Sequence, residues 1–345
     1  MLNMFKKKTG KSSFVLLSLL VLMLVLSACG SNAANNSAGS SNAGSNAGNA
    51  AASTEPSDSA APSEATERTI KDAMGHDVKI PANPQRVLAS YLEDHLVALG
   101  VKPVAQWSVA DGKSVQDYLQ SSLADVPAIG YDLPPEQVAS FTPDLIIIDS
   151  ESAVEKGLYE QYSAIAPTFV LGDAVRNDWR KSLTTIADLL GKQDEAEKVL
   201  ADYDQKAADT KSKLEAAGVT GQSAAVLWIT QKTVYMVKDS VASGEVLYKD
   251  LGFAEPSLAA DISKTAQADW NPVPLEQLSK LDADHLFVMN SDGPESETVK
   301  SPLWQGLKAV KNGNVHEVSP TGGWMYKGAV AGGQIMDDVL SNLVK

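Results

Sequence analysis

The chain has 345 residues, of which 44% are hydrophobic and 21% are charged, a composition typical of a folded protein with about two lobes. Its formal net charge at pH 7 is −14. A chain this acidic repels phosphate backbones, which argues against nucleic acid as a partner. The single cysteine, Cys29, excludes an intramolecular disulfide.

The first 28 residues have the pattern of a secretory signal. A basic start is followed by the apolar run Phe14–Leu26 and by small residues before Cys29. This run is shorter than the roughly 20 residues that a membrane-spanning helix needs. The stretch Leu26-Ser27-Ala28-Cys29 resembles a bacterial lipobox, which implies cleavage after residue 28 and a diacylglycerol group on the Cys29 sulfur. Because two acyl chains give stable anchoring, we expect a lipoprotein on the outer face of a Gram-positive cell membrane. A cleaved signal followed by an incidental cysteine is the alternative.

Residues 29–66 are predicted to be the lipidated cysteine and a disordered tether. From Ser31 to Thr66 the chain is almost entirely Ser, Asn, Ala, Gly and Glu, with no aromatic residue. Such a segment cannot bury enough apolar surface to offset its ordering entropy. We expect it to hold the folded part away from the membrane.

Residues 67–181 are predicted to form an N-terminal α/β lobe. The segment Arg68–Pro81 indicates an opening hairpin with Gly75 at its turn. Strand-like and helix-like stretches then alternate, which favours βα units and a mainly parallel sheet. The expected strands are Arg86–Ala89, Val104–Trp107, Leu145–Asp149 and Thr168–Leu171, and the expected helices are Glu93–Leu99, Pro135–Ser140 and Val154–Ile165.

Residues 182–218 are predicted to be one long backbone helix, followed by a C-terminal α/β lobe at 219–345. Apolar residues recur at helical spacing from about Trp179 onward, on both sides of Gly191. The second half is rich in good helix formers, and Gly218 is expected to end it. In the C-terminal lobe we expect strands at Ser223–Thr230, Lys232–Val237, Leu286–Asn290 and Asn314–Val318, and helices at Gly244–Leu251, Leu275–Leu281 and Val330–Leu343.

An internal repeat relates the two predicted lobes. Residues Glu136–Ile148 align without a gap with Glu276–Val288. Each copy contains a proline-rich turn, Glu-Gln at a helix start, a short amphipathic helix, an aspartate and an apolar strand. Two copies on either side of the long helix indicate duplicated lobes, although the same local pattern can recur in any βα protein.

Five stretches follow the lipobox and the tether in a specific order: DAMGHDVKIPANPQRVLAS (72–90), LVALGVKPVAQW (96–107), EQVASFTPDLIII (136–148), LTTIADLLGK (183–192) and SPLWQGLKAVKNGNVHEVSP (301–320). Together these motifs resemble one protein family, the helical-backbone substrate-binding proteins of importers for siderophores, haem and cobalamin. The resemblance covers residues 68–345, and the order of the motifs is more specific than any one of them.

The resemblance implies a fold of two α/β lobes joined by one long helix, with the ligand held in the cleft between them. It also implies that Glu136 and Glu276 lie on the outer rim of the lobes and pair with arginines of an ABC permease dimer, which works with its ATPase. A solvated glutamate that suits a helix dipole is the alternative for each. We expect a monomer that captures a ferric siderophore and needs no cofactor.

Aromatic and basic residues near loops are the candidate ligand contacts. Tyr91 and Trp107 follow the ends of the first two predicted strands, where open α/β sheets bind ligands. Arg176 and Arg180 follow another strand, and Asp178-Trp179-Arg180 resembles the tryptophan–arginine pair of hydroxamate-siderophore binders. The full set of candidates is Tyr91, Trp107, Arg176, Trp179, Arg180, Trp228, Tyr235, Trp324, Tyr326 and Lys327.

The small number of arginines favours a ferric hydroxamate as the ligand. A ferric tris-catecholate carries about three negative charges and would require several cations; here it would depend on lysines such as Lys232, Lys238 or Lys327. Haem and cobalamin stay open, although His95 and His285 look structural and haem needs an axial ligand. The scattered histidines argue against bare zinc or manganese.

Enzyme function is not expected. The sequence contains no HExxH, GxSxG or GxGxxG motif and no complete Walker A motif. A surface hydrolase with an unfamiliar site is the weaker alternative, as is an adhesin or sensor lipoprotein, which would not need paired rim glutamates.

Overall fold

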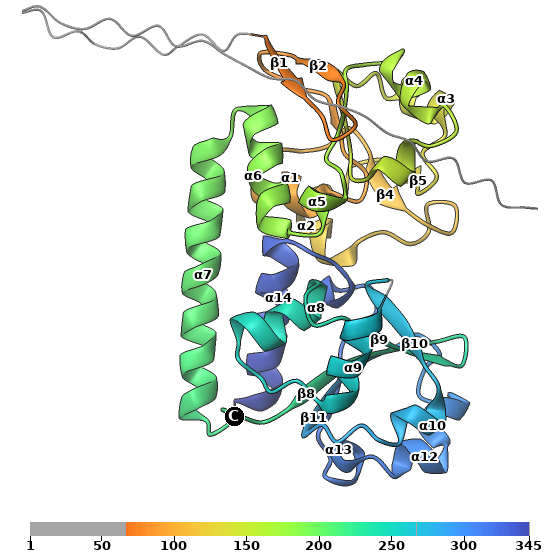
Figure 1. Ribbon diagram of the computed structural model, residues 1–345, viewed down its shortest axis with the longest axis vertical. Helices are drawn as coiled ribbons and strands as arrows, with labels where there is room; N and C mark the ends of the chain where they lie inside the picture. The colour runs from red at the N-terminus through yellow and green to blue at the C-terminus, as the bar shows by residue number, and fades with distance from the viewer. Residues whose placement is uncertain (1–66, 267, 345) are drawn as a thin grey trace, which may run out of the picture. The chain divides into compact units, whose positions relative to one another are not determined.

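The computed structural model describes residues 67–266 and 268–344, which belong to the compact unit Ala61–Lys345 (Figure 1). The predicted signal, Cys29 and the tether lie outside the described residues. None of the helices in the described part is both long and apolar enough to span a membrane.

The N-terminal lobe is built from short strands that are parallel after the opening hairpin. Strands β1 (Arg68–Lys71) and β2 (Asp77–Ile80) pair antiparallel. Parallel pairing then joins β3 (Val87–Leu88), β6 (Leu145–Ile148) and β7 (Thr168–Val170) in one sheet, and β4 (Gln106–Ser108) with β5 (Ala128–Gly130) in another. Every residue of β6 is buried, as its apolar run predicts. The helical segments of this lobe are α1 (Glu93–Ala98), η1 (Asp117–Leu119), α2 (Gln120–Leu123), α3 (Pro135–Ser140), η2 (Glu151–Val154), α4 (Leu158–Ser163) and α5 (Asp173–Arg176).

The long helix predicted for residues 182–218 is two helices. Helix α6 (Trp179–Leu190) ends at Gly191, whose φ of 67° is left-handed, and α7 (Gln193–Ala216) begins two residues later. Glycine suits this C-terminal position because it carries no Cβ. The backbone helix is therefore α7 alone, 24 residues long. Its buried residues form a single stripe: Ala196, Tyr203, Ala207, Thr210 and Leu214.

The C-terminal lobe contains a mixed five-stranded sheet in the order β10-β9-β8-β11-β12. Strands β8 (Ala224–Thr230), β11 (His285–Asn290) and β12 (Val315–Glu317) are parallel, while β9 (Thr233–Val237) and β10 (Trp270–Val273) are antiparallel additions. The β8–β9 loop consists of Gln231 and Lys232, both with positive φ, which is the two-residue hairpin turn that matches strand twist.

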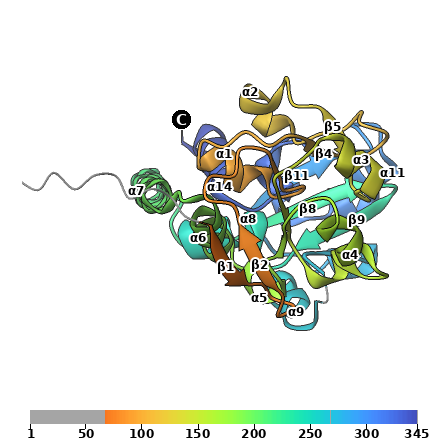
Figure 2. The same ribbon diagram turned by 90° about the horizontal axis from the view of Figure 1, so that it is seen from above.

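Helices and helical turns cover both faces of this sheet, and the last of them, α14 (Ala329–Leu343), packs against α7. The covering segments are α8 (Ala242–Glu245), the π-helical turn η3 (Val246–Asp250), α9 (Ser257–Thr265), α10 (Leu275–Leu278), α11 (Glu297–Lys300), α12 (Pro302–Gln305), α13 (Lys308–Lys311), η4 (Gly323–Met325) and α14 (Ala329–Leu343). In Figure 1, α14 runs beside α7, and Figure 2 shows α7 end-on at one edge of the molecule. A shared apolar core joins α6, α7 and α14 to the β3-β6-β7 sheet and to the five-stranded sheet.

The two copies of the repeat adopt the same local structure. Helices α3 and α10 each follow a proline, and an aspartate lies before the strand that comes next in each copy. Asp144 accepts hydrogen bonds from the backbone N–H groups of Gln85 and Arg86, ahead of β3. Asp284 accepts one from the N–H of Ser223, ahead of β8. In each lobe, the aspartate carboxylate therefore connects the strand of the repeat to its parallel neighbour at the start of both strands. The pairs are β6 with β3 and β11 with β8.

Candidate functional site

The largest group of predicted contacts meets at the carboxyl ends of β3 and β4. A cavity of about 380 Å³ opens there, lined by aromatic, apolar and acidic side chains from four parallel strands and the loops that follow them. Its lining residues are Ser90, Tyr91, Trp107, Val109, Tyr131, Leu133, Ile148, Asp149 and Ala153. Ligands in open α/β sheets bind at this edge of the strands, so we call this cavity the aromatic bowl.

Tyr91 is held in an unusual conformation at this edge. Its φ is 67°, which is uncommon for a residue with a large side chain. Its side chain is nevertheless 44% exposed, and Tyr131 on the far side of the bowl is 69% exposed. An exposed tyrosine on a strained backbone, as at Tyr91, with a second exposed tyrosine across from it, is typical of a binding surface rather than of packing.

Tyr326 from the η4 loop brings the C-terminal part of the chain to the same rings. Its ring centroid lies 5.9 Å from that of Tyr91 and 6.3 Å from that of Trp107. Tyr91 and Trp107 are 5.3 Å apart, and Tyr118 stacks on Tyr326 at 5.4 Å. Three of the predicted contact residues are therefore neighbours, although they are far apart in the sequence.

A smaller cavity of about 130 Å³ adjoins the bowl and shares Tyr91 and Asp149 with it. We call it the polar chamber. Its two cations are already paired: Arg176 lies 3.1 Å from Asp149, and Lys327 lies 3.0 Å from Asp269. The chamber is lined by Tyr91, Leu92, Asp94, His95, Gln116, Asp149, Arg176, Ser182, Asp269, Trp270, Met325, Tyr326 and Lys327.

Three consecutive ionisable residues of α1 are buried beside the chamber. Burial raises the pKa of Glu93 to about 7 and that of Asp94 to about 6, and it lowers the pKa of His95 to about 4, with nearby Lys327 adding to the last effect. The Glu93 carboxylate accepts a hydrogen bond from the backbone N–H of Trp107 at 2.6 Å, and this bond fixes the backbone of β4 against α1. Asp94 accepts the N–H groups of Val330 and Ala331, at the start of α14.

A second aromatic group lies on the C-terminal sheet. Trp228 on β8 contacts Tyr235 on β9 at 5.4 Å and Trp270 on β10 at 6.2 Å between ring centroids. Trp270 lines the polar chamber, whereas Trp228 and Tyr235 line neither the chamber nor the bowl. These two predicted contacts are therefore connected to the chamber only through Trp270.

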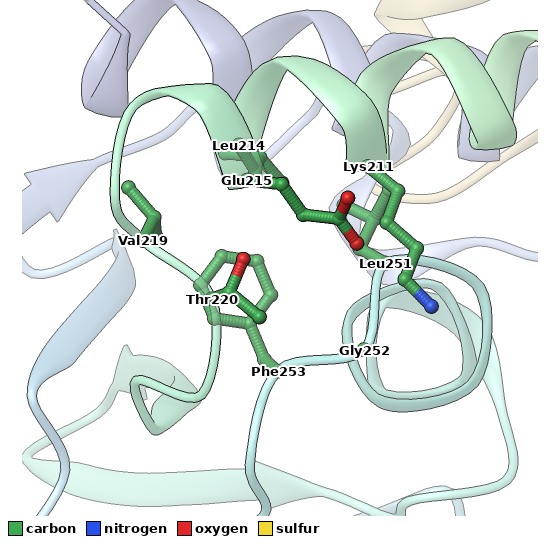
Figure 3. Close-up of a pocket in the computed structure, with 8 residues that line it drawn as sticks. All are labelled: Lys211, Leu214, Glu215, Val219, Thr220, Leu251, Gly252 and Phe253. Carbon is green, nitrogen blue, oxygen red and sulfur yellow. The ribbon is translucent and has the colours of Figure 1, made fainter.

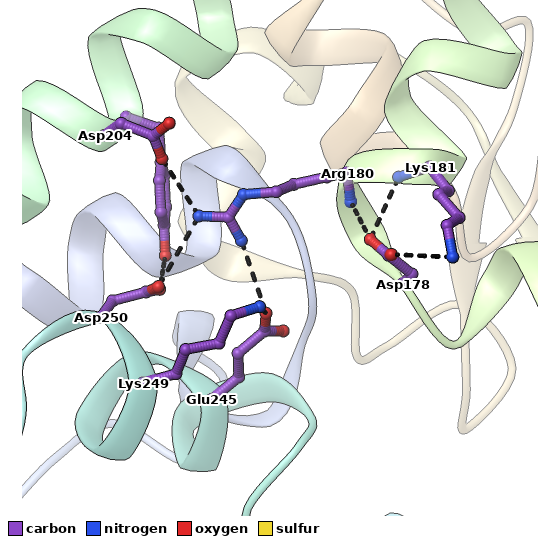
Figure 4. A network of polar contacts seen from close by, with 8 residues as sticks. Asp178, Arg180, Lys181, Asp204, Glu245, Lys249 and Asp250 are labelled. Atoms are coloured by element: carbon purple, nitrogen blue, oxygen red, sulfur yellow. Dashed lines mark hydrogen bonds and ion pairs between the residues drawn. The ribbon is translucent and has the colours of Figure 1, made fainter.

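Trp179 and Arg180 lie elsewhere, which corrects the expectation that this pair meets a ligand in the cleft. Asp178 caps α6, and Trp179 is only 4% exposed, packed edge-to-face on Tyr203 at 4.7 Å. Arg180 stacks over both rings and pairs with carboxylates at 3.2–3.6 Å: Asp204, Glu245 and Asp250 (Figure 4). These partners lie on α7, α8 and η3, so Arg180 connects helices rather than lining either cavity.

Trp324 is also a packing residue, contrary to the sequence expectation. It is fully buried, stacks on Phe287 at 4.8 Å and donates its indole N–H to Asp338 at 2.7 Å. Its donor is therefore already used, and no ring face is open to a ligand.

Other cavities fit a ligand less well. Figure 3 shows one at the end of α7, lined by residues such as Leu214 and Phe253, whose volume of about 20 Å³ suits a single water. Another, of about 490 Å³, lies among α1, α7 and α14. Its lysine, Lys206, is paired with Asp337 at 2.7 Å, and its one aromatic residue, Tyr203, is buried and bonded to Asp250.

Sequence reasoning missed Tyr131 and Asp149 as lining residues and treated His95 as structural. It noted Trp270 among the aromatic residues near loops but did not select it as a contact. Tyr131 and Asp149 directly follow β5 and β6, so the strand-end rule that selected Tyr91 would have selected them. Trp270 lies on an edge strand that contains Pro272, and no period-2 pattern marks it.

Glu136 and Glu276 are both exposed, in the first turns of α3 and α10. Within the described residues neither carboxylate forms an ion pair or a hydrogen bond. Figure 1 places α3 and α10 far from each other, on the side away from α7.

Comparison with known proteins identifies the family. The family model described as periplasmic binding protein matches residues 89–320. This range contains every residue that lines the bowl and all that line the chamber except Met325, Tyr326 and Lys327. The chain belongs to the periplasmic binding protein family. Its members are binding proteins rather than enzymes.

Individual members of the periplasmic binding protein family match along most of the chain. The probable siderophore-binding lipoprotein YfiY of Bacillus subtilis is 32% identical, covering 84% of this chain and 92% of its own. The iron(3+)-hydroxamate-binding protein FhuD of the same organism is 29% identical, covering 78% and 84%. The crystal structure of Staphylococcus aureus SirA, complexed with staphyloferrin B, superposes with a TM-score of 0.67 at 28% identity, covering 80% and 98%.

Proposed function

We propose that this periplasmic binding protein captures a ferric siderophore in the aromatic bowl and delivers it to an ABC importer. The observation that carries the proposal is the aromatic cluster at a cavity of about 380 Å³: Tyr91 and Trp107 line this cavity, and Tyr326 packs against both rings. Aromatic walls with few placed charges suit an organic chelate of low charge. The names of the similar siderophore-binding proteins point the same way.

A hydroxamate siderophore is the favoured ligand class. Arg176 and Lys327 are the two cations at the site, and each is already neutralised by an aspartate within about 3 Å. A tris-catecholate would bring about three negative charges to paired cations, whereas a ferric trihydroxamate can be neutral. The FhuD relative is named for iron-hydroxamate binding, which adds support.

Calorimetric titration with a panel of ligands tests this proposal. We expect a neutral ferric trihydroxamate to bind with a sub-micromolar Kd, and ferric tris-catecholate, ferric citrate, haem and cobalamin to bind more weakly. Tight binding of haem or cobalamin alone would replace the siderophore proposal with another ligand of the same family.

From the sequence, we propose that a lipid on Cys29 anchors the protein to the membrane. Residues 29–66 would then be the tether, and residues 67–181 and 219–345 the two lobes. Cys29→Ala should leave ligand binding intact while the protein is shed into the medium. Membrane fractionation measures this, with Ser27→Thr as a substitution that keeps the cysteine. Full membrane retention of the Cys29→Ala protein would contradict lipidation.

Docking to a permease dimer through Glu136 and Glu276 is proposed because both are exposed, lack partners among the described residues and occupy equivalent places in the repeat. A monomer with one such carboxylate on each lobe could meet equivalent basic residues on the two permease subunits. Iron uptake by a protein in which both glutamates are replaced tests this proposal.

A further inference from the structure

We propose that the polar chamber is a subsite for the end of a siderophore arm, and that it selects an uncharged group that both donates and accepts hydrogen bonds, such as an amide or a hydroxyl. This inference rests on the proposed function, because the bowl must hold the iron-bound part of the same ligand. It specifies which siderophores of the favoured class fit best.

Two residues that line the chamber each have a buried polar atom without a partner among the described residues. His95 comes from α1 and is 4% exposed, and its Nδ1 has no hydrogen-bond partner within the described residues. Trp270 comes from β10 in the other lobe, and its indole Nε1 is likewise buried and unpartnered there. An unpaired buried polar group costs about 1–3 kcal/mol. Two such atoms on side chains that line one cavity therefore indicate a polar occupant.

The donor and acceptor pattern of these atoms restricts the occupant. The indole of Trp270 can only donate, so the occupant must accept a hydrogen bond. Burial holds the pKa of His95 at about 4, so its imidazole is neutral near pH 7, and one ring nitrogen donates while the other accepts. A group that both accepts and donates can satisfy both atoms with either tautomer of His95, whereas a carboxylate can do so only when Nδ1 carries the proton.

The charges that line the chamber disfavour a charged occupant of either sign. Arg176 and Lys327 are held by Asp149 and Asp269, and the carboxylate of Asp94 is bonded to the start of α14. An arriving carboxylate would lie near three acidic groups, and an arriving ammonium would find all three already bonded, two to cations and one to backbone N–H groups. Either must compete with an existing ion pair, so a neutral group enters at lower cost.

The geometry gives such a group a direct route. The chamber shares Tyr91 and Asp149 with the bowl, so an arm that leaves a chelate in the bowl can pass between these two side chains. The chamber's volume of about 130 Å³ is larger than one water needs and suits the end of an arm rather than a whole chelate.

Matched ligands test the subsite. Calorimetry measures the binding of three linear ferric trihydroxamates to the protein. The three differ only at the arm end, which carries an ammonium, an acetamide or a succinyl carboxylate. We expect the acetamide form to bind about fivefold more tightly than either charged form. Trp270→Phe keeps the ring and removes the N–H, so it should lower affinity for the acetamide form about fivefold and leave the two charged forms nearly unchanged.

Trp228→Phe is the control, because the Trp228 indole donates to Ser291 at 3.0 Å and does not line the chamber. It should leave the order of the three ligands unchanged. Equal affinities for the three ligands, or an equal loss for all three in Trp270→Phe, would overturn the subsite while leaving siderophore capture standing. Failure of all three to bind would overturn the proposed function and the subsite with it.

Discussion

At the scale of single residues, two nearby arginines have opposite roles. Arg176 pairs with Asp149 at the wall shared by the bowl and the chamber, whereas Arg180 holds three carboxylates that join α6 to α7, α8 and η3. The Arg180 side chain is 26% exposed, and those of Glu245 and Asp250 are 13% and 7% exposed. Removing the cation leaves Glu245 with Lys249 and Asp250 with the Tyr203 hydroxyl as their remaining partners, so the two buried carboxylates lose most of their compensation.

Substitution of each arginine by glutamine should separate these roles. Arg180→Gln should lower the free energy of unfolding by about 2–4 kcal/mol and leave the ligand Kd within about twofold. Arg176→Gln should change stability by less than about 1 kcal/mol and weaken ferric hydroxamate binding severalfold. Thermal unfolding and calorimetry on both proteins measure this, and an exchange of the two outcomes would show that the ligand meets Arg180.

Glu93 should give the protein a distinctive pH dependence of stability. The folded chain keeps the Glu93 proton up to about pH 7, while the ordinary pKa in an unfolded chain is 4.5. The contribution of this group to stability is therefore fully present below pH 4.5 and is lost as the pH rises to about 7. The loss is on the order of 3 kcal/mol. Asp94 acts in the same direction up to about pH 6, whereas His95, with its lowered pKa, acts in the opposite direction.

Glu93→Gln isolates this effect, because the amide oxygen can still accept the N–H of Trp107. The Tm of this variant relative to the native protein should be higher at pH 8 than at pH 4.5. Glu136→Gln, at an exposed position, is the matched control and should show no such change. A constant Tm difference between native protein and Glu93→Gln from pH 4.5 to 8 would mean that Glu93 titrates as an ordinary glutamate.

At the scale of elements, Asp94 joins α1 to the start of α14. Both carboxylate oxygens accept backbone N–H groups, at 3.1 Å from Val330 and 2.8 Å from Ala331. Gly328, with a φ of 140°, precedes them, and a Cβ there would collide with the Asp94 carboxylate. The contact is an N-terminal cap supplied by a distant part of the chain.

Asp94→Ala should lower the free energy of unfolding by about 1–2 kcal/mol, because two N–H groups of α14 lose their acceptor. Asp94→Asn, which keeps one carboxamide oxygen, should lose less. Chemical denaturation of the two variants measures the difference. Equal stability of Asp94→Ala and native protein at pH 7 would show that these N–H groups find water at no cost.

Most elements were predictable from local pattern, and the exceptions have identifiable causes. The continuously apolar run of β6 and the turn-helix-strand pattern of the repeat are recovered in the structure. Gly191 was missed as a break because the apolar spacing continues on both sides of it. The helix expected at Val154–Ile165 divides at Gly157, whose φ is 80°, into η2 and α4.

The site was predictable where it depends on topology and not where it depends on packing. Tyr91 and Trp107 follow from the rule that ligands bind at strand ends. The orientation of Trp179 does not, because Asp178 starts α6 there and turns the indole to the same buried face as Leu183 and Ile186. His95 and Trp270, which both line the chamber, lie in different lobes, and no local pattern connects them.

At the scale of the whole molecule, delivery to a permease requires contacts on both lobes. A protein with Glu136→Lys and Glu276→Lys together should bind its ligand normally and fail to support iron uptake in a strain that lacks the native protein. Each reversed charge adds repulsion to a lost ion pair. Single substitutions should be milder, since an exposed ion pair contributes about 1 kcal/mol or less.

Lys280→Glu, close to Glu276 in sequence, serves as the control for a general effect of surface charge. Normal uptake by the doubly substituted protein would remove the two glutamates from docking. Loss of ligand binding by the same protein would instead place them at the ligand site.

The central claim is that the aromatic bowl holds the ferric siderophore, and the position of the iron atom tests it most directly. Crystals of the protein grown with a ferric trihydroxamate and measured at the iron absorption edge locate this atom by anomalous scattering. We predict a single anomalous peak in the cavity lined by Tyr91, Trp107 and Tyr131, with Tyr326 against the ligand. A peak in the cavity among α1, α7 and α14, or beside Arg180, would contradict the account.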